Sequence, residues 1–85
     1  MSHKINRIRS VPPTPGTDCD AAFAIHFDDG PEPNMLVEYA AGAGQRFASE
    51  SHARTVVATF YLEDDEPPRR LLVDMQGNVQ PRELL

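Results

Sequence analysis

The sequence predicts a two-layer α+β domain in which one helix packs on one face of an antiparallel sheet, with the element order βββαββ. Three observations predict it: several segments alternate apolar and polar residues, one segment has apolar residues at helical spacing, and short connections rich in glycine or proline separate them. The chain of 85 residues is long enough for one domain only.

The first half of the chain is expected to form three strands. In residues 21–27, bulky apolar residues alternate with alanines and His26, which is typical of a half-buried strand. A segment of aspartate, glycine and proline then has the chemistry of a turn, and residues 35–41 alternate again. Residues 42–44 have the composition of a tight connection, so residues 45–48 are expected to return as a short third strand.

The second half is expected to form one helix and then a hairpin. Ser49 is a good N-cap, and Glu50 places a negative charge in the first turn of a helix over residues 53–62. Apolar residues recur there at i, i+3, i+4 and i+7, namely Ala53, Val56, Val57 and Phe60. The same stretch also alternates and holds β-branched residues, so a strand is the alternative. Residues 70–75 and 79–80 are expected to pair around a Gly-Asn turn.

The N-terminal residues are expected to precede the domain. Residues 1–18 read as a basic arm followed by a linker with three prolines, and residues 19–85 as the single α+β domain. Within the arm, apolar residues three positions apart are compatible with a short helical turn or with a mobile segment.

Net charge and cysteine content indicate the expected cellular compartment and the expected class of binding partner. The formal net charge is −5, which is unlike the basic balance of most nucleic-acid-binding proteins. The only cysteine, Cys19, excludes an internal disulfide and is typical of a reducing, cytoplasmic location. No signal peptide or membrane-spanning run is found. A domain this small without a disulfide is expected to gain stability as a homodimer.

No catalytic, cofactor-binding or metal-binding motif is present, so we expect no cofactor and favour a non-enzymatic role. Lys4 is the only lysine, and no Gly-x-Ser-x-Gly sequence occurs, which removes two common kinds of nucleophilic site. Histidines lack the spacing of known metal motifs. A small metal-dependent enzyme built on His26, His52 and acidic residues therefore stays only as a second alternative.

The favoured function is a small acidic protein-binding or regulatory module. Acidic clusters would steer it to another protein with a basic surface, and leucines on the sheet face away from the helix would add apolar contact. The residues expected to bind the partner are Asp28, Asp29, Leu36, Glu63, Asp64, Asp65, Glu66 and Leu72. The first alternative is a nucleic-acid-binding regulator, because three of the eight basic residues and no acidic residue lie in the first ten positions.

The element order of residues 21–80, with paired strands, a helix and a final strand–Gly–strand unit (residues 71–80), is similar to that of many small bacterial proteins. In size and acidity the chain also resembles small phage-encoded inhibitors, including some anti-CRISPR proteins. The resemblance is one of pattern and implies no role for any individual residue.

Overall fold

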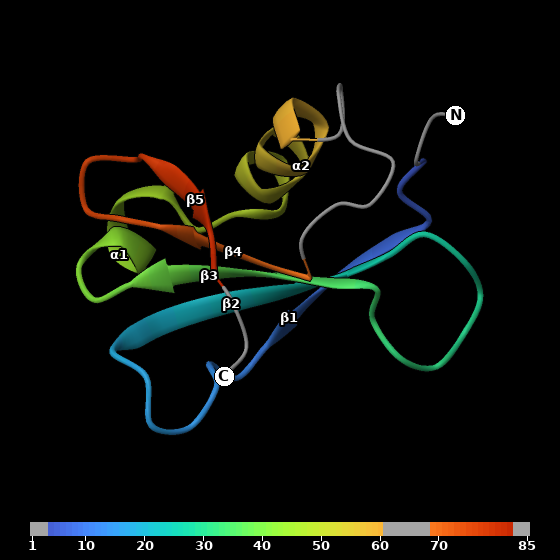
Figure 1. Ribbon diagram of the computed structural model, residues 1–85, viewed down its shortest axis with the longest axis horizontal. Helices are drawn as coiled ribbons and strands as arrows, with labels where there is room; N and C mark the ends of the chain where they lie inside the picture. Colours follow the sequence, from blue (N-terminus) through green and yellow to red (C-terminus); the bar gives the residue numbers. More distant parts are fainter. Residues whose placement is uncertain (1–3, 61–68, 83–85) are drawn as a thin grey trace.

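The computed structural model of this chain describes residues 4–60 and 69–82, in which five strands and two helices form an α+β fold (Figure 1). The elements in chain order are β1 (Arg7–Val11), β2 (Cys19–His26), β3 (Met35–Ala40), α1 (Ala43–Phe47), α2 (Glu50–Phe60), β4 (Arg70–Val73) and β5 (Val79–Pro81). Within these described residues, no helix is long and apolar enough to cross a lipid bilayer.

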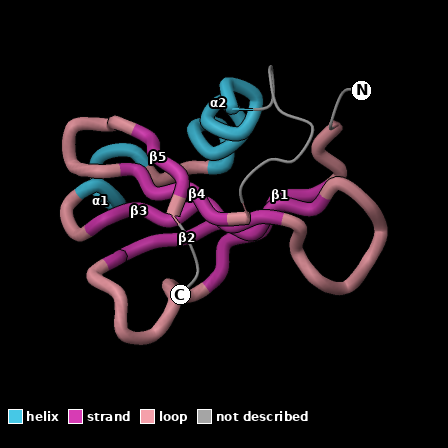
Figure 2. The backbone as a smooth tube through the Cα atoms, in the orientation of Figure 1, coloured by secondary structure: helices cyan, strands magenta, loops and turns pink. Residues whose placement is uncertain are grey.

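The five strands form one mixed sheet whose spatial order, β1-β2-β3-β4-β5, equals their order along the chain (Figure 2). Neighbouring strands are antiparallel except β3 and β4, which are parallel. Parallel neighbours need a long crossover connection, and both helices lie in the segment that joins β3 to β4. The prediction of a wholly antiparallel sheet is therefore wrong at this pair.

The N-terminal segment contributes a strand that was not predicted. Residues predicted as a helical turn or an arm form β1, which pairs with β2. Ile8 lies opposite Ile25 and packs against the buried core, while Arg7 and Arg9 lie on the other face. Apolar residues three positions apart favour a helix, but pairing with β2, which is distant in sequence, makes this segment a strand instead.

The predicted third strand over residues 45–48 is wrong, because Ala43–Phe47 forms helix α1. Asp20, on the neighbouring strand β2, accepts hydrogen bonds from the backbone N–H groups of Gly42 and Gly44, each with a donor–acceptor distance of 3.0 Å. A helix start leaves such N–H groups without partners inside the helix. The side chain that satisfies them is far from α1 in sequence, so local pattern does not reveal it.

The second helix is confirmed in place of the alternative strand. Helix α2 begins one residue after Ser49, whose hydroxyl oxygen accepts a hydrogen bond of 3.0 Å from the N–H of His52, as an N-cap does. The predicted end of this helix, residues 61 and 62, lies outside the described residues. The last two strands form the expected hairpin, although Asp74 and Gly77 belong to a longer connection than a two-residue turn.

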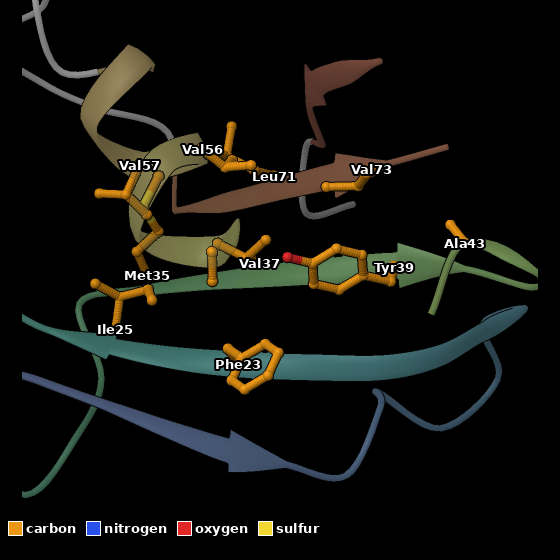
Figure 3. Close-up of a cluster of buried hydrophobic side chains, with 11 residues drawn as sticks. Phe23, Ile25, Met35, Val37, Tyr39, Ala43, Val56, Val57, Leu71 and Val73 are labelled. Atoms are coloured by element: carbon orange, nitrogen blue, oxygen red, sulfur yellow. The ribbon is translucent and has the colours of Figure 1, made fainter. Parts of the chain in front are cut away.

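One cluster of buried side chains joins the sheet to the second helix (Figure 3). The sheet residues of this cluster are Phe23, Ile25, Met35, Val37, Tyr39, Leu71 and Val73. Helix α2 adds Ala53, Val56 and Val57, which are three of the four residues predicted to share its apolar stripe. Because alternate residues of a strand point to opposite faces, the remaining sheet side chains are left on the face away from this cluster.

Candidate functional site

The sheet face opposite the buried cluster carries most of the arginines, and we call it the arginine face. By register, its residues are Arg7, Arg9 and Val11 of β1, Ala22, Ala24 and His26 of β2, Leu36 and Glu38 of β3, and Arg70 and Leu72 of β4. Arg82, which follows β5, also reaches this face, where its guanidinium lies 3.9 Å from Glu38. Four arginines thus gather on one face of the sheet in a chain of net charge −5.

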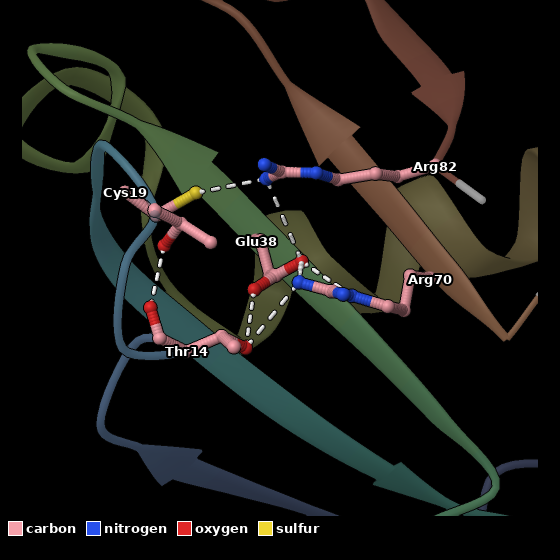
Figure 4. Close-up of polar contacts among 6 residues, drawn as sticks. Thr14, Cys19, Glu38, Arg70 and Arg82 are labelled. Carbon is pink, nitrogen blue, oxygen red and sulfur yellow. Dashed lines mark hydrogen bonds and ion pairs between the residues drawn. The ribbon is translucent and has the colours of Figure 1, made fainter. Parts of the chain in front are cut away.

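A buried carboxylate organises the centre of the arginine face (Figure 4). Arg70 donates two hydrogen bonds to Oε1 of Glu38, one from Nε at 2.8 Å and one from Nη2 at 2.6 Å. The hydroxyl of Thr14 donates to Oε2 of Glu38 at 2.8 Å. The Glu38 side chain is 0% exposed and that of Arg70 is 11% exposed. Arg82 completes the group, with Nη1 3.5 Å from Sγ of Cys19. One carboxylate therefore balances part of a larger positive charge.

The same contacts show that the arginine face is partly covered by the chain itself. Thr14 belongs to the proline-rich segment between β1 and β2, so its bond to Glu38 holds that segment over the sheet. Leu36 and Leu72, expected to supply exposed apolar contact, are half-buried. Among the described residues, Met75 is the one large hydrophobic side chain classed as exposed, at 50%.

His26 lies buried at one end of this face, between two arginines. Arg9 donates from Nε to Nε2 of His26 over 3.1 Å, and Nη2 of Arg7 lies 3.4 Å from Nδ1. Burial, and then the positive charges of Arg7 and Arg9, hold the pKa of His26 below its usual value of 6.5, while Gly30 and Asp28 act weakly in the opposite direction. Burial and the two arginines favour the neutral imidazole, and their combined effect exceeds that of Gly30 and Asp28.

This environment predicts a pH dependence of stability. Below about pH 6.5, His26 is protonated in the unfolded chain but stays neutral in the folded chain. The free energy of unfolding therefore falls as the pH drops through this range. We expect His26→Gln to flatten that dependence in urea denaturation curves recorded between about pH 7.5 and pH 5.5. Parallel curves for the two proteins across this range would contradict the assignment.

A pocket of about 260 Å³ opens where β3 and β4 begin. The residues that line it are Thr14, Pro33, Asn34, Met35, Leu36, Arg69 and Arg70, and most of the surface that they expose to the pocket comes from apolar atoms. Leu36 and Arg70 are neighbours in the parallel register, so the pocket continues the arginine face at its end. Arg69 is exposed, and it forms no ion pair with any residue of the described ranges.

The predicted partner-binding residues that the structure describes lie in two separate places. Leu36 and Leu72 share the arginine face, as predicted. Asp28 and Asp29 lie on the exposed loop between β2 and β3, where Asp28 accepts from the N–H of Gly30 and Asp29 accepts from the side chain of Asn6. The acidic run Glu63, Asp64, Asp65 and Glu66 lies outside the described residues.

The two histidines proposed for a metal site lie on different sides of the sheet. His52 shares a hydrogen bond of 2.7 Å with the hydroxyl of Tyr39, and its ring stacks on Phe47. Tyr39 belongs to the buried cluster, where burial raises its pKa to about 12, whereas His26 lies on the arginine face. Across residues 4–60 and 69–82, no three His, Cys, Asp or Glu side chains are grouped closely enough to hold a metal ion.

Sequence reasoning missed the convergence of Arg7 and Arg9 with His26, and the burial of Glu38. The signal was present in the alternation Arg-Ile-Arg of residues 7–9, which places both arginines on one face once the segment is read as a strand. Comparison of the chain with protein-family models, with curated proteins and with solved structures found no match.

Proposed function

We propose that this chain is a non-enzymatic protein-binding module whose arginine face, together with the pocket at its end, binds an acidic segment of another protein. The observation that carries the proposal is the mainly apolar pocket with Arg69 at its rim. A complementary segment would place an apolar side chain in the pocket and a neighbouring carboxylate on that arginine. The proposal takes the fold as two layers, with α2 on the sheet face away from this surface.

The size and chemistry of the pocket support a side chain as its occupant. A volume of about 260 Å³ is below the range of roughly 300–1,000 Å³ that is usual for drug-sized ligands. Leu36 and Pro33 supply apolar lining, and burial of apolar surface is the main source of affinity in such contacts. Arg70 already binds Glu38, whereas Arg69 is exposed and has no ion pair with the described residues, so Arg69 is the guanidinium to which we assign the partner's carboxylate.

The charges favour an acidic protein partner over the basic one expected from composition. The expectation of a basic partner rests on the acidic body of the chain, with Asp28, Asp29 and residues 63–66 as its steering clusters, and residues 63–66 lie outside the described part of the chain. The arginine face holds four arginines, at positions 7, 9, 70 and 82. Among the described residues, Glu38 is the carboxylate of this face that forms ion pairs, and it forms them with Arg70 and Arg82. Complementary charge across an interface raises the association rate and rejects partners of the wrong sign.

The same surface lacks a feature that single-stranded nucleic acid would use. Sheet surfaces that bind RNA carry aromatic side chains on which bases stack. None of the residues assigned to the arginine face is a phenylalanine or tyrosine, since Phe23 and Tyr39 point into the buried cluster. A protein partner is therefore favoured, and nucleic acid is left as an outcome that the experiment must distinguish.

The test is affinity capture from a lysate of the source organism, read by mass spectrometry, with and without nuclease. We expect one protein to be retained by the wild type and by the control Arg54→Glu, whose exposed arginine lies on α2. Leu36→Asp should lose about tenfold or more of that protein, because it replaces apolar lining with a carboxylate that repels an acidic segment and can itself pair with Arg69 or Arg70. Arg69→Glu should lose about fivefold, as expected for a partly exposed charge pair.

Circular dichroism should confirm that each variant is folded before capture is compared. Equal retention by the wild type, Leu36→Asp and Arg69→Glu would overturn the proposal. Loss of all specific retention after nuclease treatment would also overturn it, and would move nucleic-acid binding to first place.

A further inference from the structure

Two guanidinium groups meet on one imidazole at the β1 edge of the arginine face. Arg7 and Arg9 are two positions apart on β1, so their side chains leave the same side of the strand. Both then turn toward His26, the register partner of Arg7 on β2, and contact different nitrogens of its ring at 3.4 and 3.1 Å. Two positive charges are thereby held close together around a side chain that is 0% exposed.

No described carboxylate neutralises this pair. The ion pairs found in residues 4–60 and 69–82 involve Arg70 and Arg82 with Glu38, and neither Arg7 nor Arg9 takes part in one. Asp28 is near enough to influence the titration of His26, but it accepts a hydrogen bond from the backbone N–H of Gly30 and forms no ion pair with Arg7 or Arg9. The mutual repulsion of the two guanidinium groups is therefore relieved by no ion pair among the described residues.

Most of the N–H donors of the two arginines have no partner among the described residues. A guanidinium has five N–H donors in a planar fork. Arg9 uses Nε on the imidazole and Arg7 contacts it with Nη2, while both side chains are otherwise exposed. The remaining N–H groups can bind a ligand on the solvent side without breaking either contact. A neutral imidazole has one acceptor nitrogen, so the bond from Nε holds Arg9 in place before the ligand arrives, while Arg7 lies beside the ring without a second such bond.

We propose that Arg7, Arg9 and His26 form a binding site for a phosphoryl dianion. A phosphoryl group carries about −1.5 to −2 charge at neutral pH and three acceptor oxygens, which match two guanidinium groups. A carboxylate carries one charge and two oxygens, which a single arginine can satisfy. The site does not rest on the proposed function, because neither Arg69 nor the pocket at the start of β3 contributes to it.

The test is titration of the ¹⁵N-labelled full chain with inorganic phosphate at constant ionic strength, following the Nε–Hε signals of its arginines. We expect saturable shifts of the Arg9 and Arg7 signals. Arg9→Gln, and separately Arg7→Gln, should weaken phosphate binding by about tenfold or more, because each removes a charge-assisted contact. Arg54→Gln removes an equal charge from the exposed surface of α2 and should leave the affinity unchanged.

Two further titrations identify the form of the ligand. Acetate should bind at least about tenfold more weakly than phosphate if charge and oxygen number decide recognition. Tighter binding of O-phosphoserine than of inorganic phosphate would identify a phosphate ester as the source, and the reverse order would identify the free ion. Shifts that do not saturate, equal affinity for acetate and phosphate, or equal weakening by Arg54→Gln would each overturn the proposal.

Discussion

Arg70→Met is expected to lower the free energy of unfolding by about 3–5 kcal/mol, which is the usual cost of removing one partner from a buried ion pair. The variant would leave the carboxylate of Glu38, whose side chain is 0% exposed, without either of the N–H donors of Arg70. A domain of this size has a total stability of roughly 3–5 kcal/mol, so the variant should be largely unfolded at room temperature. Circular dichroism and urea denaturation measure this directly.

The matched control is a double variant that removes both charges. Glu38→Leu combined with Arg70→Met should recover most of the lost stability, because replacing a buried pair with apolar residues is often neutral or stabilising. Thr14→Val removes the hydrogen bond to Glu38 and a longer one that Thr14 accepts from Arg70, and should cost about 1–2 kcal/mol. A loss below about 1 kcal/mol for Arg70→Met alone would contradict the role given to this pair.

Gly44→Ala is expected to lower the free energy of unfolding by about 2 kcal/mol. A Cβ atom at Gly44 would overlap the Oδ1 atom of Asp20, so the carboxylate would have to leave the start of α1. Two hydrogen bonds to a charged acceptor would be lost, at about 1.5 kcal/mol each, and the higher helix propensity of alanine would return about 1 kcal/mol. Urea denaturation again provides the measurement.

The next residue of the same helix provides the control for this substitution. Gln45 is exposed, so Gln45→Ala should change stability by no more than about 0.5 kcal/mol. Asp20→Asn keeps the shape of the side chain but removes its charge. It should therefore lower the free energy of unfolding by less than Gly44→Ala does. A Gly44→Ala protein as stable as Gln45→Ala would show that Asp20 does not hold the start of α1.

Periodicity predicted those elements whose own side chains define a buried face. Phe23 and Ile25 alternate along β2, and Val56 and Val57 fall on one stripe of α2, so each pattern is complete within its segment. Strand β1 and helix α1 depend instead on partners elsewhere in the chain. Ile8 needs Ile25 to form a strand pair, and the start of α1 needs a carboxylate from β2.

The candidate site was predictable only in its apolar part. Leu36 and Leu72 were placed on one face because the strand period alone assigns them there. The arginines are distributed over separate segments of the chain, and they share a surface only once the strand order and register are known. Net charge is a sum over residues and contains no information on where the charges lie, so an acidic composition does not reveal a face that gathers arginines.

Site-specific photo-crosslinking tests most directly whether the arginine face is the binding surface. Gln80 is exposed and pairs with Leu72 in register, so a p-benzoylphenylalanine placed there probes this face, while one at position 54 probes α2. After irradiation in cells of the source organism, we predict a crosslinked protein from position 80 that survives nuclease, and none from position 54. A crosslink from position 54 alone, or equal crosslinks from both positions, would contradict the account.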